Sequence, residues 1–97
     1  LEVQGLDGEF AKRNQITAES GVVITKVMAE TPAQRAGLKP GMVIQEVNRK
    51  EVADVSAYNK LTEEAKKKYD EGKGNIILLY VLNTDNNNQF ITVNLAE

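Results

Sequence analysis

The sequence lacks two residue types on which the common nucleophilic centres of enzymes depend, histidine and cysteine. The 97 residues include no histidine and no cysteine, so neither a Ser-His-Asp nor a Cys-His centre can form. Ser20 and Ser56 are the only serines, and no lysine spacing supports a Ser-Lys pair. Glu63 and Glu64 would point to different sides of a helix, so they are a poor general acid and base pair. We therefore expect this chain to bind rather than to catalyse.

The sequence gives no support for a cofactor or a metal. Without cysteine, the chain can form neither a disulfide nor a Cys-based metal site. Gly37 and Gly41 do not form a phosphate-binding loop, because no glycine-rich run surrounds them between a strand and a helix. We expect no cofactor, and we assign both glycines to backbone turns.

The bulk composition is that of one small globular domain. A chain of 97 residues buries about 60–70% of its unfolded surface in a single core, so we expect residues 1–97 to form one domain. The net charge of -2 argues against nucleic acid as a partner. No apolar stretch approaches the ~20 residues of a membrane span, so we expect no membrane insertion. The start at Leu1, without methionine, indicates a fragment of a larger protein.

Several stretches alternate apolar and polar residues or are rich in β-branched residues, as strands are. The predicted strands are residues 1–6, 21–28, 42–48, 75–83 and 89–96. The last two flank the polar loop TDNNN and should form a hairpin. A short strand continuation is expected at Glu51 and Val52, and residues 9–14 are compatible with a short helix.

The stretch TPAQRAGLKPG predicts a very short helix followed by a turn. Thr31 suits the N-cap, Pro32 the first helical position, and Gln34 the third position of a capping box. Gly37 can then take the left-handed conformation that ends the helix, with Leu38 as its apolar contact. A helix of about one and a half turns does not persist alone in water, so it must pack on a larger body.

One long helix is expected from a cap at Asp54 or Ser56 to about Tyr69. Apolar residues at helical spacing mark its buried face: Val55, Tyr58, Leu61, Ala65 and Tyr69. These elements can bury their apolar faces together only if the sheet curls around them. We therefore predict an α+β fold, a partly open β-barrel or sandwich of about five strands with one short and one long helix.

The run GVVITKVMAETPAQRAGLKPGMVIQEVN, residues 21–48, resembles the PDZ domains of bacterial HtrA/Deg serine proteases. The family run has a Gly-Val-Val strand, then Ser/Thr-Pro-Ala-x-x-Ala-Gly-Leu, x-x-Gly-Asp-x-Ile and x-x-Val-Asn-Gly. The polar insert between LEVQGL and GVVI is similar to that of the second PDZ domain of such proteases.

The chain departs from the family pattern at three places. Met42 stands where the family usually has Asp, which is expected to loosen a turn hydrogen bond. Arg49 stands where the family usually has Gly, so the turn type is not fixed by the pattern. The family's carboxylate-binding loop, an apolar-Gly-apolar stretch before the first strand, is represented by Leu1 alone.

The resemblance implies a binding mode in which an extended peptide, often a protein's C-terminus, adds as a strand between an edge strand and the long helix. It assigns the following peptide-binding residues: Leu1, Glu2, Val3, Gln4 and Gly5 on the edge, and Val55, Asn59 and Thr62 on the helix. Some PDZ domains carry a His at the position of Val55 that bonds a ligand hydroxyl. Because this chain has no His, the resemblance implies an apolar preference there, at an affinity of about micromolar.

Other interpretations of the same residues stay open. Leu1, Val3 and Val55 also fit simple core positions, and Asn59 and Thr62 fit solvated helix positions. By resemblance the chain is a regulatory peptide-binding module of an HtrA/Deg-type serine endopeptidase in the bacterial periplasm or cell envelope, where its partners would be unfolded segments and the neighbouring protease and PDZ domains. The alternatives are a structural module that holds domains or subunits together, or a PDZ domain of a secretion component or a tail-specific peptidase.

Overall fold

The computed structural model describes residues 2–6, 21–85 and 87–95 of the chain. Their elements, in order, are β1 (Glu2–Gly5), β2 (Val22–Lys26), α2 (Pro32–Arg35), β3 (Val43–Val47), β4 (Lys50–Glu51), α3 (Val55–Asp70), β5 (Ile76–Leu82) and β6 (Asn88–Asn94). These bounds agree with the predicted strands and helices to within a few residues. Residues 9–14, for which a short helix was predicted, lie outside the described residues.

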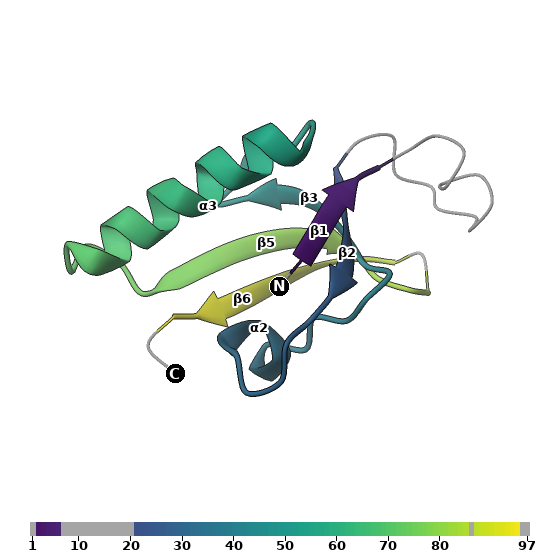
Figure 1. Cartoon of the computed structure of the whole chain (residues 1–97), viewed down its shortest axis with the longest axis horizontal. Helices are drawn as coiled ribbons and strands as arrows, with labels where there is room; N and C mark the ends of the chain where they lie inside the picture. Colours follow the sequence, from purple (N-terminus) through teal and green to yellow (C-terminus); the bar gives the residue numbers. More distant parts are fainter. Residues whose placement is uncertain (1, 7–20, 86, 96–97) are drawn as a thin grey trace.

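The six described strands form one sheet in the order β1-β2-β3-β5-β6, with β4 paired to β3, and every pairing is antiparallel. The sheet curls so strongly that β2 runs at a steep angle to β5 and β6, while α3 lies along one side (Figure 1). This is the expected α+β fold with a partly open sheet. The count is six strands because the short continuation after β3 pairs as a strand of its own.

The core lies on the inner face of this curled sheet. Its most deeply buried side chains are β-branched residues of the central strands, in keeping with the apolar runs of the sequence: Val22, Ile24, Ile44, Val47 and Val81. Leu38 after α2 and Tyr58 of α3 close the core from the helical side. A smaller cluster of Val23, Val43 and Leu82, with Leu6 packed against it, occupies the other face.

The short helix α2 is held by the bonds that its sequence predicts, with one difference. The Thr31 hydroxyl accepts from the Gln34 N–H at 3.3 Å and so caps the helix. At the other end Gly37 takes φ 94°, and the Leu38 N–H donates to the Ala33 carbonyl at 3.2 Å, which is a Schellman motif. The Gln34 side chain accepts from the Glu30 N–H at 2.9 Å, one residue before the cap, so the expected reciprocal bond to the cap itself is replaced.

The long helix α3 begins at Asp54, whose carboxylate accepts from the Ala57 N–H at 2.8 Å. Tyr58 and Ala65 are buried and Val55 is half-buried, as the helical spacing predicts. The prediction for Tyr69 was wrong, because this residue is 38% exposed. It lies in the last turn of α3 and lines a surface hollow with the following loop.

The two departures in turn residues have visible consequences. Met42 places its side chain in the core, and its N–H donates to the Lys39 carbonyl at 3.3 Å, which closes the turn before it. Asn48 and Arg49 adopt φ of 51° and 68°, so the turn into β4 has left-handed backbone at both residues. Arg49 therefore occupies a conformation that glycine adopts at lower cost.

Candidate functional site

The first strand ends the sheet and leaves one side without a strand partner among the described residues. β1 pairs with β2 from Glu2 opposite Lys26 to Gly5 opposite Val22. The Leu6 N–H donates to the Gly21 carbonyl at 3.3 Å. Because backbone groups alternate in direction along an antiparallel strand, the N–H and C=O groups of Val3 and Gly5 point to the open side. This edge can therefore accept another strand.

The side chains of β1 divide between two faces. Val3 is half-buried and packs against the main core, whereas Glu2 and Gln4 are exposed. The register shifts between Glu2 and Val3, and the Thr25 hydroxyl donates to the Glu2 carbonyl at 3.1 Å, which fixes the start of the strand on β2. Leu1, the remaining predicted edge residue, lies outside the described residues.

The far end of β1 lies against the start of α3. A Cβ placed on Gly5 would stand 3.9 Å from a methyl carbon of Val55, with no other contact closer. The structure thus brings together two of the predicted binding residues from positions fifty residues apart in sequence. A larger side chain at residue 5 would point toward α3 and occupy the space beside the open edge.

The three predicted helix residues play different parts. Asn59 is exposed, Val55 is half-buried against the core, and Thr62 is half-buried about two turns after Val55. The Thr62 hydroxyl donates to the Tyr58 carbonyl at 2.9 Å and to the Asn59 carbonyl at 3.0 Å. The single hydroxyl hydrogen of Thr62 is therefore shared between two carbonyls of the helix itself, so Thr62 has no free donor for a ligand.

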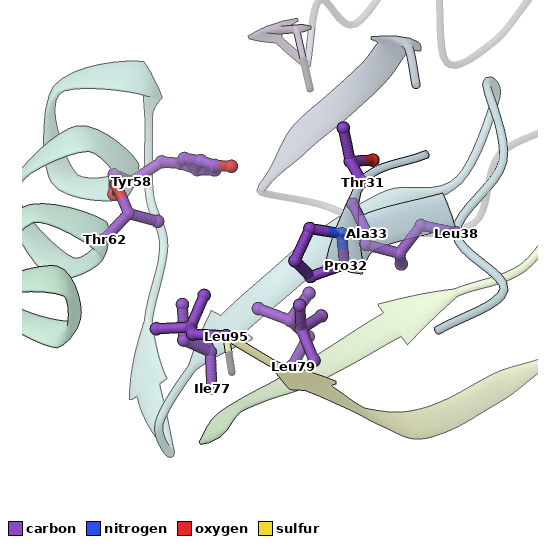
Figure 2. A pocket seen from close by; sticks show the side chains of 10 residues that line it. Thr31, Pro32, Ala33, Leu38, Tyr58, Thr62, Ile77, Leu79 and Leu95 are labelled. Atoms are coloured by element: carbon purple, nitrogen blue, oxygen red, sulfur yellow. Dashed lines mark hydrogen bonds between the residues drawn. The ribbon is translucent and has the colours of Figure 1, made fainter. Parts of the chain in front are cut away.

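A cavity of about 270 Å³ opens between α3 and α2, over the inner face of β5 and β6. Figure 2 shows Tyr58 and Thr62 on the α3 side facing Pro32 and Ala33 across it, with Ile77 and Leu95 below. The remaining lining residues are Thr31, Leu38, Leu79 and Val93. An engineered apolar cavity of about 150 Å³ is enough to hold benzene, so this space can take a large apolar side chain.

The walls of the cavity are electrically neutral. The Thr31 hydroxyl donates to the Met28 carbonyl at 2.8 Å and caps α2, so it too is engaged. Burial raises the pKa of the Tyr58 phenol, which keeps it protonated. Neither an acid nor a base faces the space, so the cavity favours an uncharged, apolar group.

Sequence reasoning placed Thr62 in the site but missed most of the cavity. The sequence predicts Tyr58 on the buried face of the long helix, and Pro32 and Leu38 at the start and the end of the short one. Tyr58 lies four residues before Thr62, on the same helical face, and this spacing is the signal that connects them. Whether α2 lines the cavity depends on how the sheet curls, and no short stretch of the sequence indicates that curvature.

Comparison with known proteins agrees with this geometry. The family model described as the PDZ domain matches residues 3–80. The chain belongs to the PDZ family. The predicted resemblance to PDZ domains is therefore confirmed. A PDZ domain is a non-catalytic domain.

Two curated relatives of this PDZ domain carry the name probable periplasmic serine endoprotease DegP-like. That of Chlamydia trachomatis serovar D is 30% identical over 89 residues, and that of Chlamydia muridarum is 32% identical over 89 residues. Each match covers 88% of this chain and 18% of the relative. The chain thus spans about a fifth of the length of these serine endoproteases, which their name places in the periplasm, as the resemblance implied.

Solved structures give the same fold. The HtrA-type protease AlgW with a decapeptide is 26% identical, with a TM-score of 0.74, and the match covers 97% of this chain and 27% of that chain. The HtrA3 PDZ domain bound to a phage-derived ligand is 19% identical, with a TM-score of 0.70, covering 97% of this chain and 79% of that chain. Both similar structures contain a peptide, a decapeptide in AlgW and the phage-derived ligand FGRWV in the HtrA3 PDZ domain.

In the described part of the chain no helix is long and apolar enough to cross a membrane, and no group of acidic residues could hold a metal ion.

Proposed function

We propose that this PDZ domain binds the end of an extended peptide as an added strand on β1, with one apolar ligand side chain in the cavity beside Thr62. The observation that carries the proposal is the coincidence of an unpaired strand edge with a neutral cavity on the adjoining helix. An edge strand supplies backbone bonds to any peptide, and the cavity supplies the preference.

The direction of the bound peptide follows from antiparallel pairing. Gly5, at the end of β1, lies at Val55, the first residue of α3. A ligand that runs antiparallel to β1 therefore ends near Glu2, on the side of Thr62 and the cavity. Its last side chain would enter the cavity, and the side chain two positions earlier would meet Val55, because alternate residues of a strand share a face.

The size of the interactions is consistent with moderate affinity. Each backbone hydrogen bond contributes about 0.5–1.5 kcal/mol net. Burying a Val, Leu, Ile or Phe side chain contributes about 1.5–3 kcal/mol. After the entropy cost of ordering the peptide, an affinity of about micromolar, on the order of -8 kcal/mol, is expected.

We further infer that the parent of this domain is an HtrA/Deg-type serine endopeptidase of the periplasm and that the domain regulates it by capturing peptide ends. The support is the similarity to the two DegP-like endoproteases and to AlgW, whose structure contains a decapeptide. The domain would supply recognition, and the catalytic residues would lie elsewhere in the parent.

The proposal is tested by titrating the chain with a fluorescent decapeptide that ends in Val, and with a matched peptide that ends in Asp. The Val peptide should bind about tenfold or more tightly, because the neutral cavity cannot stabilise a second carboxylate beside the terminal one. Gly5→Val should weaken binding of the Val peptide at least about tenfold by filling the space beside Val55. Gln4→Val, on the exposed opposite face of β1, is the matched control and should leave the affinity within about threefold.

Two outcomes of these titrations would contradict the proposal. If the two peptides bind equally, the cavity does not select the last ligand side chain. If Gly5→Val and Gln4→Val have the same effect, recognition by strand addition at β1 is wrong. A structural role in domain or subunit contacts would then be the better account.

A further inference from the structure

The last strand of the sheet, β6, is an edge that lacks the features by which proteins usually protect one. Its seven residues, NQFITVN, include no charged residue, no proline and no glycine. It pairs with β5 from Ile76 opposite Asn94 to Leu82 opposite Asn88 without a register shift. Natural edge strands are commonly shortened, charged, bulged or interrupted by proline, which prevents pairing with another chain. β6 is long, regular and neutral.

The backbone groups on the open side of β6 can be identified from the bonds at both ends of the hairpin. The Asn83 N–H donates to the Asn87 carbonyl at 2.9 Å, and the Leu95 N–H donates to the Asn75 carbonyl at 2.7 Å. Odd-numbered residues of β6 therefore bond to β5, and the N–H and C=O groups of Asn88, Phe90 and Thr92 point outward. Within the described part of the chain, no backbone or side-chain bond is recorded for these outward groups.

An exposed aromatic ring marks the middle of this edge. Phe90 is 62% exposed, and its ring centroid lies 4.8 Å from that of Tyr80 on the neighbouring strand. Both rings lie on the outer face of the sheet, because Ile91 and Leu79 alternate with them and point into the core. The short helix α2 lies beside Val93 of β6 on the inner face, next to the cavity, and none of the residues that the structure describes covers the outer face around Phe90.

We propose that β6 pairs with β6 of a second copy of this chain in an antiparallel, two-fold arrangement centred on Phe90. In this register Phe90 stands opposite Phe90 of the second copy, and Asn88 stands opposite Thr92, so each of the three outward residues exchanges two backbone bonds. The next symmetric register, centred on Ile91, would place Phe90 opposite Thr92 and so would separate the two Phe90 rings. A well-matched partner is an uncharged strand that places an aromatic residue opposite Phe90, and β6 of a second copy has both properties.

The Phe90 register also extends an existing row of rings. Tyr80 and Phe90 of one copy would continue into Phe90 and Tyr80 of the other across the joined sheets. Aromatic residues directly opposite each other are among the favourable cross-strand pairs, whereas like charges there are unfavourable. The pairing uses the edge opposite to β1, so it can coexist with peptide binding and does not depend on it.

The first test is sedimentation equilibrium of the 97-residue chain over a wide concentration range. A monomer–dimer equilibrium with a dissociation constant on the order of 0.1 mM is expected for so small an interface. Phe90→Lys places two like charges in contact and should weaken the dimer at least about tenfold. Gln89→Lys adds the same charge on the other face of β6 and should change the constant by less than about threefold. Thr92→Pro removes an outward N–H without touching the β5 ladder and should also weaken the dimer, with the folded spectrum retained.

The second test fixes the register, using the absence of native cysteine. Phe90→Cys should form an intermolecular disulfide under mild oxidation, because opposite residues in a hydrogen-bonded pair lie about 5.5 Å apart at Cα. Gln89→Cys should not, since the two copies of residue 89 would be about 8 Å or more apart. A chain that stays monomeric at every concentration, or one that crosslinks equally at both positions, overturns the proposal. Peptide binding by Phe90→Lys should be unchanged, which separates this test from that of the β1 edge.

Discussion

The two ends of the sheet show how differently an unpaired strand can be presented. β1 has four residues, begins with the charged Glu2 and carries a register shift, whereas β6 has seven uncharged residues in regular pairing. β1 lies against the start of α3, and the same helix opens a cavity one turn beyond. On the outer face of β6, the structure describes no helix of this kind, and the Phe90 ring contacts only that of Tyr80 on β5 as an aromatic neighbour.

The comparison shows that the ability of an edge to pair with another strand differs from its ability to select one peptide over another. Both edges offer backbone donors and acceptors, which any extended chain could use. At β1 the adjoining helix and cavity add side-chain requirements, so a particular peptide end is favoured. At β6 we propose that the partner is a second copy of the same strand, because it presents the same uncharged residues and the same aromatic ring. Two of the changes below, Gly21→Ala and Thr62→Phe, should disturb the β1 edge, whereas Arg49→Gly and a change of pH should leave both edges intact.

Gly21→Ala is expected to have the largest effect, because it disrupts the support of β1. Gly21 has φ 132°, and a Cβ there would lie 2.6 Å from the Ile44 carbonyl oxygen. We expect the free energy of unfolding to fall by about 3 kcal/mol, measured by chemical denaturation. Gly74→Ala is the control, since nothing lies within 4 Å of its added Cβ and its backbone is not in the left-handed region. Equal losses for the two variants would contradict this account.

Filling the cavity should weaken peptide binding at β1 without unfolding the domain. Thr62→Phe projects a ring into the space that the ligand side chain would occupy, so affinity for the Val-ending peptide should fall about tenfold, or ~1.4 kcal/mol. Thr62→Val keeps the shape and loses a hydroxyl that is bonded within α3, so the affinity should stay within about twofold. Isothermal titration measures both. A large loss with Thr62→Val would mean that the hydroxyl contacts the ligand.

Arg49→Gly should stabilise the fold and alter neither edge. Arg49 has φ 68°, a conformation in which glycine is not penalised. The turn itself is held by Asn48, whose side-chain oxygen accepts from the Leu78 N–H at 2.9 Å. We expect the free energy of unfolding to rise by about 1 kcal/mol in thermal or chemical denaturation. Arg49→Ala keeps the left-handed strain and should bring no gain, so a gain for both variants would point to a cause other than backbone strain.

The smallest effect is expected from pH. The chain has no histidine, so no side chain with an ordinary pKa between 6 and 9 faces the site. Burial raises the pKa of Tyr58 above 10.0, which means that folding favours the neutral phenol. Its contribution to stability is complete below pH 10 and is lost as pH rises through the folded pKa. Peptide affinity should be flat between about pH 6 and 9, and Tyr58→Phe should remove the alkaline loss of stability.

The sequence predicted most accurately those parts whose residues have local backbone reasons. The α2 segment is the best case, because Thr31, Pro32 and Gly37 each suit a single position of a capped helix. The strand at residues 2–5 was also predicted locally, from the alternation of apolar and polar residues, whereas its place at the edge of the sheet was predicted from the resemblance to PDZ domains. The Gln34 bond to Glu30 differs by one residue from the expected capping box, which a pattern of residue types does not resolve.

The parts that the sequence could not predict depend on how distant elements meet. The cavity is assembled from α2, α3, β5 and β6, so no stretch of sequence contains it. Tyr69 follows the helical repeat of the buried face, yet it is exposed because the repeat does not record where the core ends. The symmetry of the β6 edge also required knowledge of which strand ends the sheet.

The most direct test of peptide recognition at β1 is amide hydrogen exchange, residue by residue, with and without a saturating apolar-ended peptide. We expect new protection of the Val3 and Gly5 amides, which point to the open side, and little change at Gln4, whose amide faces β2. The amides of Phe90 and Thr92 should be unaffected by peptide at constant protein concentration. Unchanged exchange at Val3 and Gly5 in the presence of bound peptide would contradict strand addition at this edge.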